Sequence, residues 1–540
     1  MKNNIKLMCA ASAMLMMASC TDLDVPVESQ YTEYPSSEIA QEAKLSDIYY
    51  HLRGVMGRRY MEAMALSSDE WVGYSFGSDN YYDAGTYQHA TLHCFKPEDA
   101  TIGWYEDVTA GITKANEAIT SMGATSPGAA AARAMRAYFH WVLVDGWGDT
   151  PILERQLEEG EEIERKPRAE VAQWIADELE EIIPQLTTDV TENTYGKPTR
   201  WMAEALLAKL YINWGVYTAK EAKDYDAATY QNPKLNRVVE LCEDIIQSGK
   251  FDLTAGAAGH KCKNTYRAKF TPDNGAQIKD FIYAMPYTAA NKDGMQYGRP
   301  RTWKKGNSGS YYGTTLSKSV GGNFAMTPEA SDRFTLPGDL RNEMILGGST
   351  LHVFDPATYA ITDEVYKYQD EPVQLTKTIH IVEPEYLAVA NDLTGYCQGY
   401  RSVKWFVVDE DFKNDRCQSN DVPIFRLADI YLLEAEAIVR GAKTSHHTAQ
   451  ELFNAIRSYN QAPTLQGTPT LQDILDERGR ELFDENWRRN DMIRFGTFES
   501  EYGVHVKDMK YASFDPQHRI FPIPESVLNK NPKWKQNPGY

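Results

Sequence analysis

Carboxylate side chains gather in one C-terminal stretch, "DERGRELFDENWRRNDMIRFG", at residues 476–496. Most glycoside hydrolases use two neighbouring carboxyl groups, one as a general acid and the other as a base or nucleophile. The residues that could form such a pair are Glu477, Glu481, Asp484 and Glu485. The stretch therefore raises the question of an enzyme that cleaves sugars.

The same stretch also has the pattern of a structural helix. Thr470 and Asp473 have the spacing of a capping box, which satisfies the free backbone groups at the start of a helix. On that helix Glu477 and Glu481 lie one turn apart among arginines, and interleaved opposite charges are typical of ion-pair networks. We therefore predict a structural network, no catalytic residue and no enzyme activity.

Other catalytic and metal-binding motifs are missing from the sequence. No HExxH, GxSxG, P-loop or GxGxxG pattern stands in a suitable context. His446 and His447 lie in a polar segment, which favours exposure to solvent over metal binding. The segment "NKDG" (291–294) has the pattern of a turn. No complete calcium-binding loop follows it, so calcium binding stays open without support from the sequence. We predict no metal and no cofactor.

Composition restricts the partners of the chain. The formal net charge is −20, which repels a phosphate backbone, so we expect no nucleic-acid partner. The 33 tyrosines and 11 tryptophans suit a protein that handles sugars or peptides, and they equally suit an ordinary aromatic core. The cysteines form no CxxC pair, and this makes a zinc site unexpected. Cys242 with Cys262, or Cys397 with Cys417, could form disulfides, and buried free thiols are the alternative.

Helical periodicity dominates both ends of the chain. Apolar residues recur there at helical spacing and predict pairs of neighbouring helices. The predicted helical segments are 129–151 with 169–186, 197–218 with 235–251, and 425–441 with 448–460. Between about 252 and 420 the helical pattern fades and Gly, Pro, Asn and Tyr increase, which predicts loops and short strands. The strands are expected at "DEVYKYQ" (363–369) and "SVKWFVVDE" (402–410).

The N-terminus has the pattern of an export signal. Lys2 and Lys6 precede a short apolar run over 7–18, which is too short to span a bilayer as a helix. Residues 17–20, "MASC", resemble a bacterial lipobox, which implies that residues 1–19 are removed and that Cys20 is lipidated. Loss of the two lysines would change the net charge from −20 to −22. A plain secreted protein is the alternative.

Three C-terminal stretches together resemble the signature of the SusD/RagB family of outer-membrane lipoproteins. They are "FRLADIYLLEAEAIVRG" (425–441), "ILDERGRELFDENWRRNDMIRFGTF" (474–498) and "RIFPIPESVLNKNPKWKQNPGY" (519–540). "LSDIYYHLRGVM" (45–56), "GITKANEAI" (111–119) and "GWGDTPIL" (146–153) follow the family order more loosely. Asp22 and Asp24, after the cysteine, resemble the signal that sends such lipoproteins to the cell surface.

The resemblance implies a mainly α-helical SusD-like fold, with four tetratricopeptide-like helix pairs packed against a loop-rich region with short strands. Residues 20–540 would form a single domain, made of a helical part at about 40–250, a loop-rich glycan-site part at about 251–420 and a signature part at about 421–540. The resemblance further implies a starch-utilisation-type lipoprotein, anchored in the outer membrane and facing the cell exterior. It would bind an oligosaccharide or polysaccharide and deliver it to a SusC-like TonB-dependent barrel. A peptide-binding RagB-like subunit is one alternative, and a glycoside hydrolase is another.

Two aromatic stretches match the regions that supply glycan contacts in the family. A sugar ring needs an aromatic platform and planar hydrogen-bonding side chains. In 71–87 the predicted glycan-binding residues are Trp71, Asn80, Tyr81, Tyr82 and Asp83. In 295–313 they are Tyr297, Arg299, Trp303, Tyr311 and Tyr312. The alternative is that these rings pack a loop-rich core, and that Arg299 pairs with surface carboxylates.

Overall fold

The computed structural model describes residues 38–77, 85–126, 128–158, 160–291, 294–303, 310–443 and 446–540. The chain divides into two units, 1–43 and 44–540, and the account below concerns the second unit. The predicted signal 1–19 and Cys20 lie outside the described residues, as do Asn80, Tyr81, Tyr82 and Asp83.

Helices pack against one another in a continuous series through much of the second unit. Each helix of this series contacts the next, although α10 and α14 are far apart in sequence. The series comprises α5 (Tyr105–Met122), α6 (Ala129–Trp147), α7 (Arg168–Ile182), α8 (Arg200–Ile212), α10 (Leu235–Gln247), α14 (Leu427–Val439) and α15 (Ala449–Tyr459). The other α-helices are α2 (Glu38–Met56), α3 (Arg59–Leu66), α4 (Thr86–Thr91), α9 (Trp214–Thr218), α11 (Pro328–Asp332), α12 (Leu393–Tyr396), α13 (Asp409–Phe412), α16 (Leu471–Glu481), α17 (Arg488–Phe495) and α18 (Glu525–Lys530). This arrangement confirms the mainly α-helical prediction and is compatible with tetratricopeptide-like pairs.

Local sequence explains where several of these helices begin. The Thr199 hydroxyl accepts a hydrogen bond from the backbone of Met202 and so caps α8. Thr448 with Glu451 forms a capping box at α15, and Thr470 with Asp473 forms the predicted one at α16. Of these three caps, only the one at α16 was predicted from the sequence.

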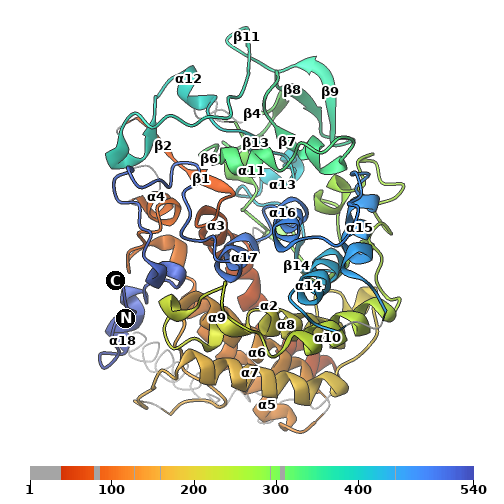
Figure 1. Cartoon of the computed structure of the whole chain (residues 1–540), viewed down its shortest axis with the longest axis vertical. Helices are drawn as coiled ribbons and strands as arrows, with labels where there is room; N and C mark the ends of the chain where they lie inside the picture. The colour runs from red at the N-terminus through yellow and green to blue at the C-terminus, as the bar shows by residue number, and fades with distance from the viewer. Residues whose placement is uncertain are drawn as a thin grey trace, which may run out of the picture. The chain divides into compact units, whose positions relative to one another are not determined.

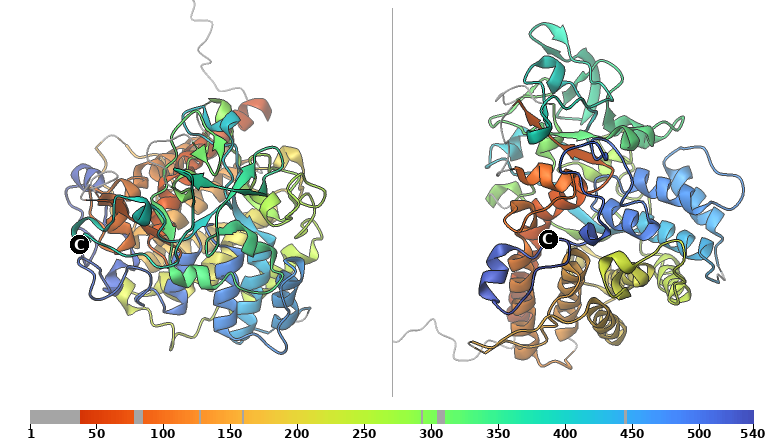
Figure 2. Two further views of the ribbon diagram at one scale, coloured as in Figure 1. Left: turned by 90° about the horizontal axis from the view of Figure 1, so that it is seen from above. Right: turned by 60° about the vertical axis from the view of Figure 1, so that its left-hand side comes forward.

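The strands are short and are joined in pairs. The antiparallel pairs are β1 (Trp71–Gly73) with β6 (Phe324–Met326), β3 (Phe281–Met285) with β14 (Val422–Arg426), β4 (Ser310–Tyr311) with β5 (Thr314–Thr315), β7 (Ile345–Leu346) with β13 (Arg401–Ser402), β8 (His352–Asp355) with β9 (Ala360–Val365), and β10 (Lys367–Tyr368) with β11 (Glu371–Pro372). One pair, β2 (Ser75–Phe76) with β12 (Ala388–Val389), is parallel. Figures 1 and 2 show most of these strands at the opposite end of the second unit from α5, α6 and α7.

Two predicted elements differ from the structure. The predicted strand at 402–410 is wrong beyond Ser402, since residues 403–408 form no strand and α13 begins at Asp409. The predicted helix at 425–441 begins only at Leu427, because the preceding residues form β14. In both places a run of buried apolar residues gives no periodicity that would separate strand, coil and helix.

The interior contains a large core among the helices and a second core beneath the loop-rich part. The helical core includes Trp141, Leu206 and Phe425, and the second includes Phe354 and Phe406. The cysteines in the described part of the chain are free thiols, all buried except the half-buried Cys94. Among the described residues, no helix has both the length and the apolar character required to cross a bilayer.

Candidate functional site

A buried carboxylate, Asp484, joins residues from both predicted glycan-binding stretches. It follows α16 in a turn with a φ of +61° and is fully buried. The Trp71 indole Nε1 donates to its Oδ1 at 3.0 Å, and the Tyr297 hydroxyl also donates to Oδ1. The Arg301 guanidinium donates to both oxygens, at 2.7 and 2.8 Å. Trp71 and Tyr297 are thus interior residues whose polar atoms are satisfied by one acid.

The remaining described aromatic residues of the second stretch lie in the core beneath the loops. Trp303, Tyr311 and Tyr312 are at most 2% exposed. The Trp303 ring lies 5.3 Å from the ring of Tyr368, and the Tyr311 ring lies 5.3 Å from that of Phe406. The three rings are buried in this conformation, which agrees with the alternative that they pack a loop-rich core. Their glycan-binding role stays a prediction.

Arg299 belongs to a short 3-10 turn, Arg299–Arg301, and its side chain lies outside the described part. The turn follows Tyr297 after one residue, Gly298, and brings Arg301 onto Asp484. The backbone of the second predicted stretch is therefore fixed to the interior at this point. The predicted role of Arg299 is untested.

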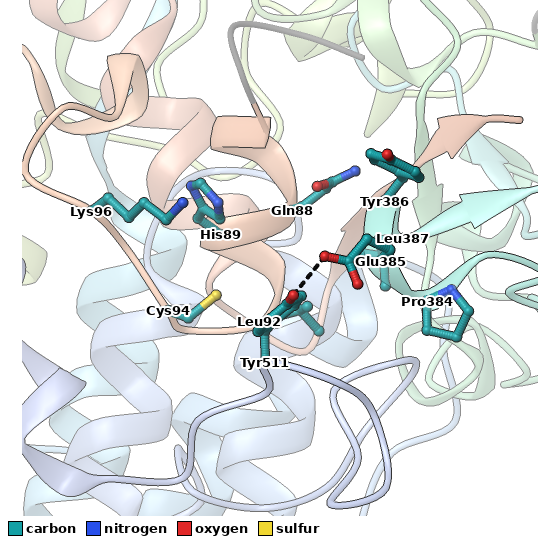
Figure 3. Close-up of a pocket in the computed structure, with 10 residues that line it drawn as sticks. All are labelled: Gln88, His89, Leu92, Cys94, Lys96, Pro384, Glu385, Tyr386, Leu387 and Tyr511. Atoms are coloured by element: carbon teal, nitrogen blue, oxygen red, sulfur yellow. Dashed lines mark hydrogen bonds between the residues drawn. The ribbon is translucent and has the colours of Figure 1, made fainter. Parts of the chain in front are cut away.

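A pocket of about 400 Å³ opens between α4 and the segment that precedes β12 (Figure 3). This volume lies within the roughly 300–1,000 Å³ range of small-molecule sites. The residues that line it are Gln88, His89, Leu92, Cys94, Lys96, Pro384, Glu385, Tyr386, Leu387 and Tyr511. None of them is among the residues predicted from the sequence to bind glycan.

Backbone pairing sets the two walls of this pocket. β2 runs beside β12, and the Ser75 hydroxyl donates to the carbonyl oxygen of Tyr386 at 2.8 Å. This fixes the wall that contains Pro384–Tyr386. The opposite wall is α4, which begins just after Gly85 with its φ of +90°. Residues 78–84, which include four of the predicted glycan contacts, lie outside the described residues.

The pocket combines an exposed ring with oriented polar groups. Tyr511 is 52% exposed, and its hydroxyl donates to Glu385 Oε1 at 2.6 Å. Lys510 pairs with the other oxygen of Glu385, so this carboxylate is neutralised. His89 Nδ1 lies 2.7 Å from Asp99 Oδ1, and this contact orients the imidazole at the rim. An aromatic face beside hydrogen-bonding groups can bind a sugar ring.

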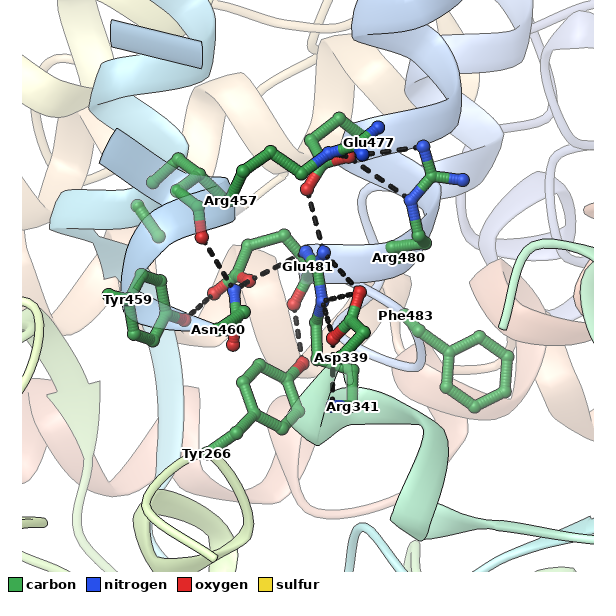
Figure 4. Close-up of polar contacts among 12 residues, drawn as sticks. Tyr266, Asp339, Arg341, Arg457, Tyr459, Asn460, Glu477, Arg480, Glu481 and Phe483 are labelled. Carbon is green, nitrogen blue, oxygen red and sulfur yellow. Dashed lines mark hydrogen bonds and ion pairs between the residues drawn. The ribbon is translucent and has the colours of Figure 1, made fainter. Parts of the chain in front are cut away.

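The acidic stretch that resembles a hydrolase site is a buried ion-pair network (Figure 4). Arg341 Nη2 lies 2.8 Å from Glu477 Oε1, and its Nη1 lies 3.1 Å from Glu481 Oε2. Arg457 and Arg480 also pair with Glu477. The prediction of a structural network is confirmed. Most partners come from other elements, so the network joins α16 to α15 and to the loop-rich part.

The electrostatics of this network do not suit acid–base catalysis. Burial alone would raise the pKa of the Glu477 carboxyl, but Arg341, Arg480 and Arg457 lower it below its usual value. Asp484 and Glu477 are both fully buried, so no substrate reaches them in this structure. A carboxylate that stays ionised and hydrogen-bonded to several arginines is poorly suited to exchange protons with a substrate.

Two family models match the chain and together cover most of it. One is described as the SusD family and matches residues 279–540, and the other is described as starch-binding associating with outer membrane and matches residues 23–212. The chain belongs to the SusD/RagB family. The prediction from the C-terminal motifs is thus confirmed.

Several SusD-type proteins are similar in sequence or fold. The starch-binding protein SusD of Bacteroides thetaiotaomicron is 24% identical, over 76% of this chain and 72% of its own length. A laminarin-binding SusD-like protein of known structure matches with a TM-score of 0.66 and 21% identity, over 93% of this chain and all of the other. The surface glycan-binding protein A of Bacteroides uniformis gives a TM-score of 0.69 at 16% identity, over 93% and 99% of the two chains. These structures confirm the SusD-like fold.

Proposed function

We propose that this SusD/RagB protein is a surface glycan-binding lipoprotein that captures an oligosaccharide or polysaccharide and delivers it, uncleaved, to a SusC-like TonB-dependent barrel. The observation that supports this most is family membership, together with relatives named for binding starch and laminarin. The description of one matching model as associating with the outer membrane supports the location. The anchor at Cys20 would keep the protein beside its barrel and raise the local concentration of glycan there.

We place the glycan at the pocket between α4 and Pro384–Tyr386. The exposed ring of Tyr511 would stack on one sugar, at a contribution on the order of a kcal/mol. Gln88, His89 and Lys96 would hydrogen-bond the hydroxyl groups. The glycan-binding role predicted for Asn80, Tyr81, Tyr82 and Asp83 stays a prediction, because these residues lie outside the described part of the chain.

The proposal of a binding protein without catalysis is supported by the ion-pair network. The carboxylates that resemble a hydrolase pair are buried and bound to arginines. Glu385, at the pocket, is held by Lys510 and Tyr511. A glycan at this site would therefore leave with its linkages intact.

A binding screen tests the function. The purified protein is titrated with soluble starch, laminarin and other glycans, and separately with mixed oligopeptides, and the mixtures are analysed for cleavage. We expect at least one glycan to bind and to be recovered unchanged. Binding of oligopeptides alone would favour the RagB-like alternative, and release of shorter sugars would refute the absence of catalysis.

Matched tyrosine variants locate the site. Tyr511→Ala is expected to weaken binding about fivefold to tenfold, as loss of one stacked ring implies. Tyr50→Ala removes a ring that is 57% exposed and does not line this pocket, and it should bind like the unaltered protein. Equal binding by both variants would place the glycan elsewhere without refuting glycan binding itself.

A further inference from the structure

Three potential metal ligands meet on the helical side of the second unit, away from the pocket of Figure 3. Glu243 lies on α10, Glu434 lies on α14, and His447 directly precedes the Thr448 cap of α15. One ligand atom from each lies within 4.8 Å of the other two. His447 Nδ1 is 3.1 Å from Glu243 Oε1 and 3.9 Å from Glu434 Oε1.

Glu434 is an unusual member of this cluster. Its side chain is fully buried, and within the described residues neither of its carboxylate oxygens has a hydrogen-bond partner. A buried acid without hydrogen bonds costs free energy unless a proton or a cation neutralises it. Glu243 is itself only 8% exposed, so water does little to separate the two acids.

We propose that Glu243, Glu434 and His447 bind one divalent transition-metal cation, with Zn²⁺ as the best-fitting ion. Zinc holds nitrogen and oxygen ligands at about 2.0–2.2 Å in a tetrahedron, which places ligand atoms roughly 3.3 Å apart. The two distances from His447 Nδ1, 3.1 and 3.9 Å, are close to that edge length. The imidazole selects zinc over Ca²⁺ and Mg²⁺, which prefer oxygen ligands throughout.

The surroundings allow a cation to enter and complete its coordination. A groove of about 660 Å³ lies beside the cluster. It is lined by His446 and by residues of α10 that include Glu243. His446 Nδ1 lies 3.1 Å from the second oxygen of Glu243, and His446 is 54% exposed at the rim. Either His446 or a water molecule from the groove can supply the fourth ligand.

Metal binding would fix the connection between α14 and α15 to α10. His447 belongs to that connection, Glu243 lies on α10 and Glu434 lies on α14. The prediction from sequence that His446 and His447 face solvent fits His446 better than His447, which is only 27% exposed. The proposal replaces the expectation that the chain has no metal site, and it does not depend on glycan binding.

Titration with zinc tests the site. Untagged protein is freed of metal with a chelator and titrated with ZnCl₂ by calorimetry, with CaCl₂ in a parallel run. We expect one equivalent of Zn²⁺ to bind and Ca²⁺ to bind at least tenfold more weakly. Glu434→Gln and His447→Ala should each weaken zinc binding at least tenfold. The matched control is Glu240→Gln, on the same helix and 63% exposed, which should bind zinc within twofold of the unaltered protein.

A second measurement covers the variants that fail to fold. Co²⁺ added to the unaltered metal-free protein should give visible absorption bands of a tetrahedral site with a nitrogen ligand, and these bands should disappear on adding Zn²⁺. No zinc uptake, no such bands, or zinc binding that is equal in Glu240→Gln, Glu434→Gln and His447→Ala would overturn the proposal.

Discussion

Replacing Asp484 with asparagine tests the idea that this buried acid holds distant parts of the chain together. Asp484→Asn keeps the size of the side chain and removes its charge. Arg301, which is 1% exposed and donates to both carboxylate oxygens at 2.7 and 2.8 Å, then loses its counter-ion. The Trp71 and Tyr297 donors keep at best a neutral acceptor.

The expected loss of stability follows from the burial of both charges. Leaving one partner of a buried ion pair without its counter-charge costs about 3–5 kcal/mol. Weakening of the hydrogen bonds from Trp71 and Tyr297 adds on the order of 1 kcal/mol. Adding Arg301→Met removes the cation that has lost its counter-ion. The double variant should therefore lose about 1–3 kcal/mol less unfolding free energy than the two single variants lose in sum.

Guanidinium chloride unfolding, followed by tryptophan fluorescence, measures these differences. The control is Glu162→Gln, which removes the partner of Lys533 from a pair whose side chains are 68% and 74% exposed. Such exposed pairs contribute about 0–1 kcal/mol. If Asp484→Asn costs no more than Glu162→Gln, the junction does not stabilise the fold and the reasoning fails.

Two further predictions concern buried residues. Trp303→Ala should destabilise the protein by about 3–5 kcal/mol, because Trp303 is 2% exposed, and Trp303→Phe should cost less. Thermal unfolding measures both variants. A loss of glycan binding with unchanged stability would instead indicate that Trp303 contacts the glycan directly. Glu70 is the second case: burial, with the charges of Asp484 and Asp69, raises its pKa from 4.5 to about 8. Between these values the folded protein holds a proton that the unfolded chain has released, so the free energy of unfolding falls as pH rises, by up to about 1.4 kcal/mol per pH unit. Glu70→Gln should remove this contribution to the fall of the unfolding free energy between pH 5 and 8. Identical pH slopes for the variant and the unaltered protein would contradict the raised pKa of Glu70.

Helix positions were predictable where the signals are local. The segment 235–251 predicted a helix, and α10 spans Leu235–Gln247 with Gly249 in the left-handed conformation after it. Helical periodicity did not predict the surroundings of α8, because every residue from Trp201 to Ile212 is buried, including Lys209, which pairs with Asp429. Burial on every side depends on neighbours from distant parts of the chain, and periodicity within one helix does not report them.

The aromatic residues could not be divided between core and binding site from sequence. Tyrosine and tryptophan suit both, since each has an apolar ring and one polar atom that needs a partner. Trp71 finds that partner in Asp484, 413 positions away. Tyr511, which is exposed at the pocket, meets Glu385 across 126 positions. Contacts over such separations exist only after the chain has folded.

The buried ion pairs also explain why the family is easier to predict than the ligand. Arg301 with Asp484 and Arg341 with Glu477 and Glu481 connect the loop-rich part to the C-terminal signature, so that signature specifies the framework. The proposed glycan pocket lies instead on loop segments and a short helix, and its Tyr511 has no part in either network. Such positions can change with little effect on the core, because exposed side chains contribute least to stability. The motifs that identify the fold therefore constrain the glycan least.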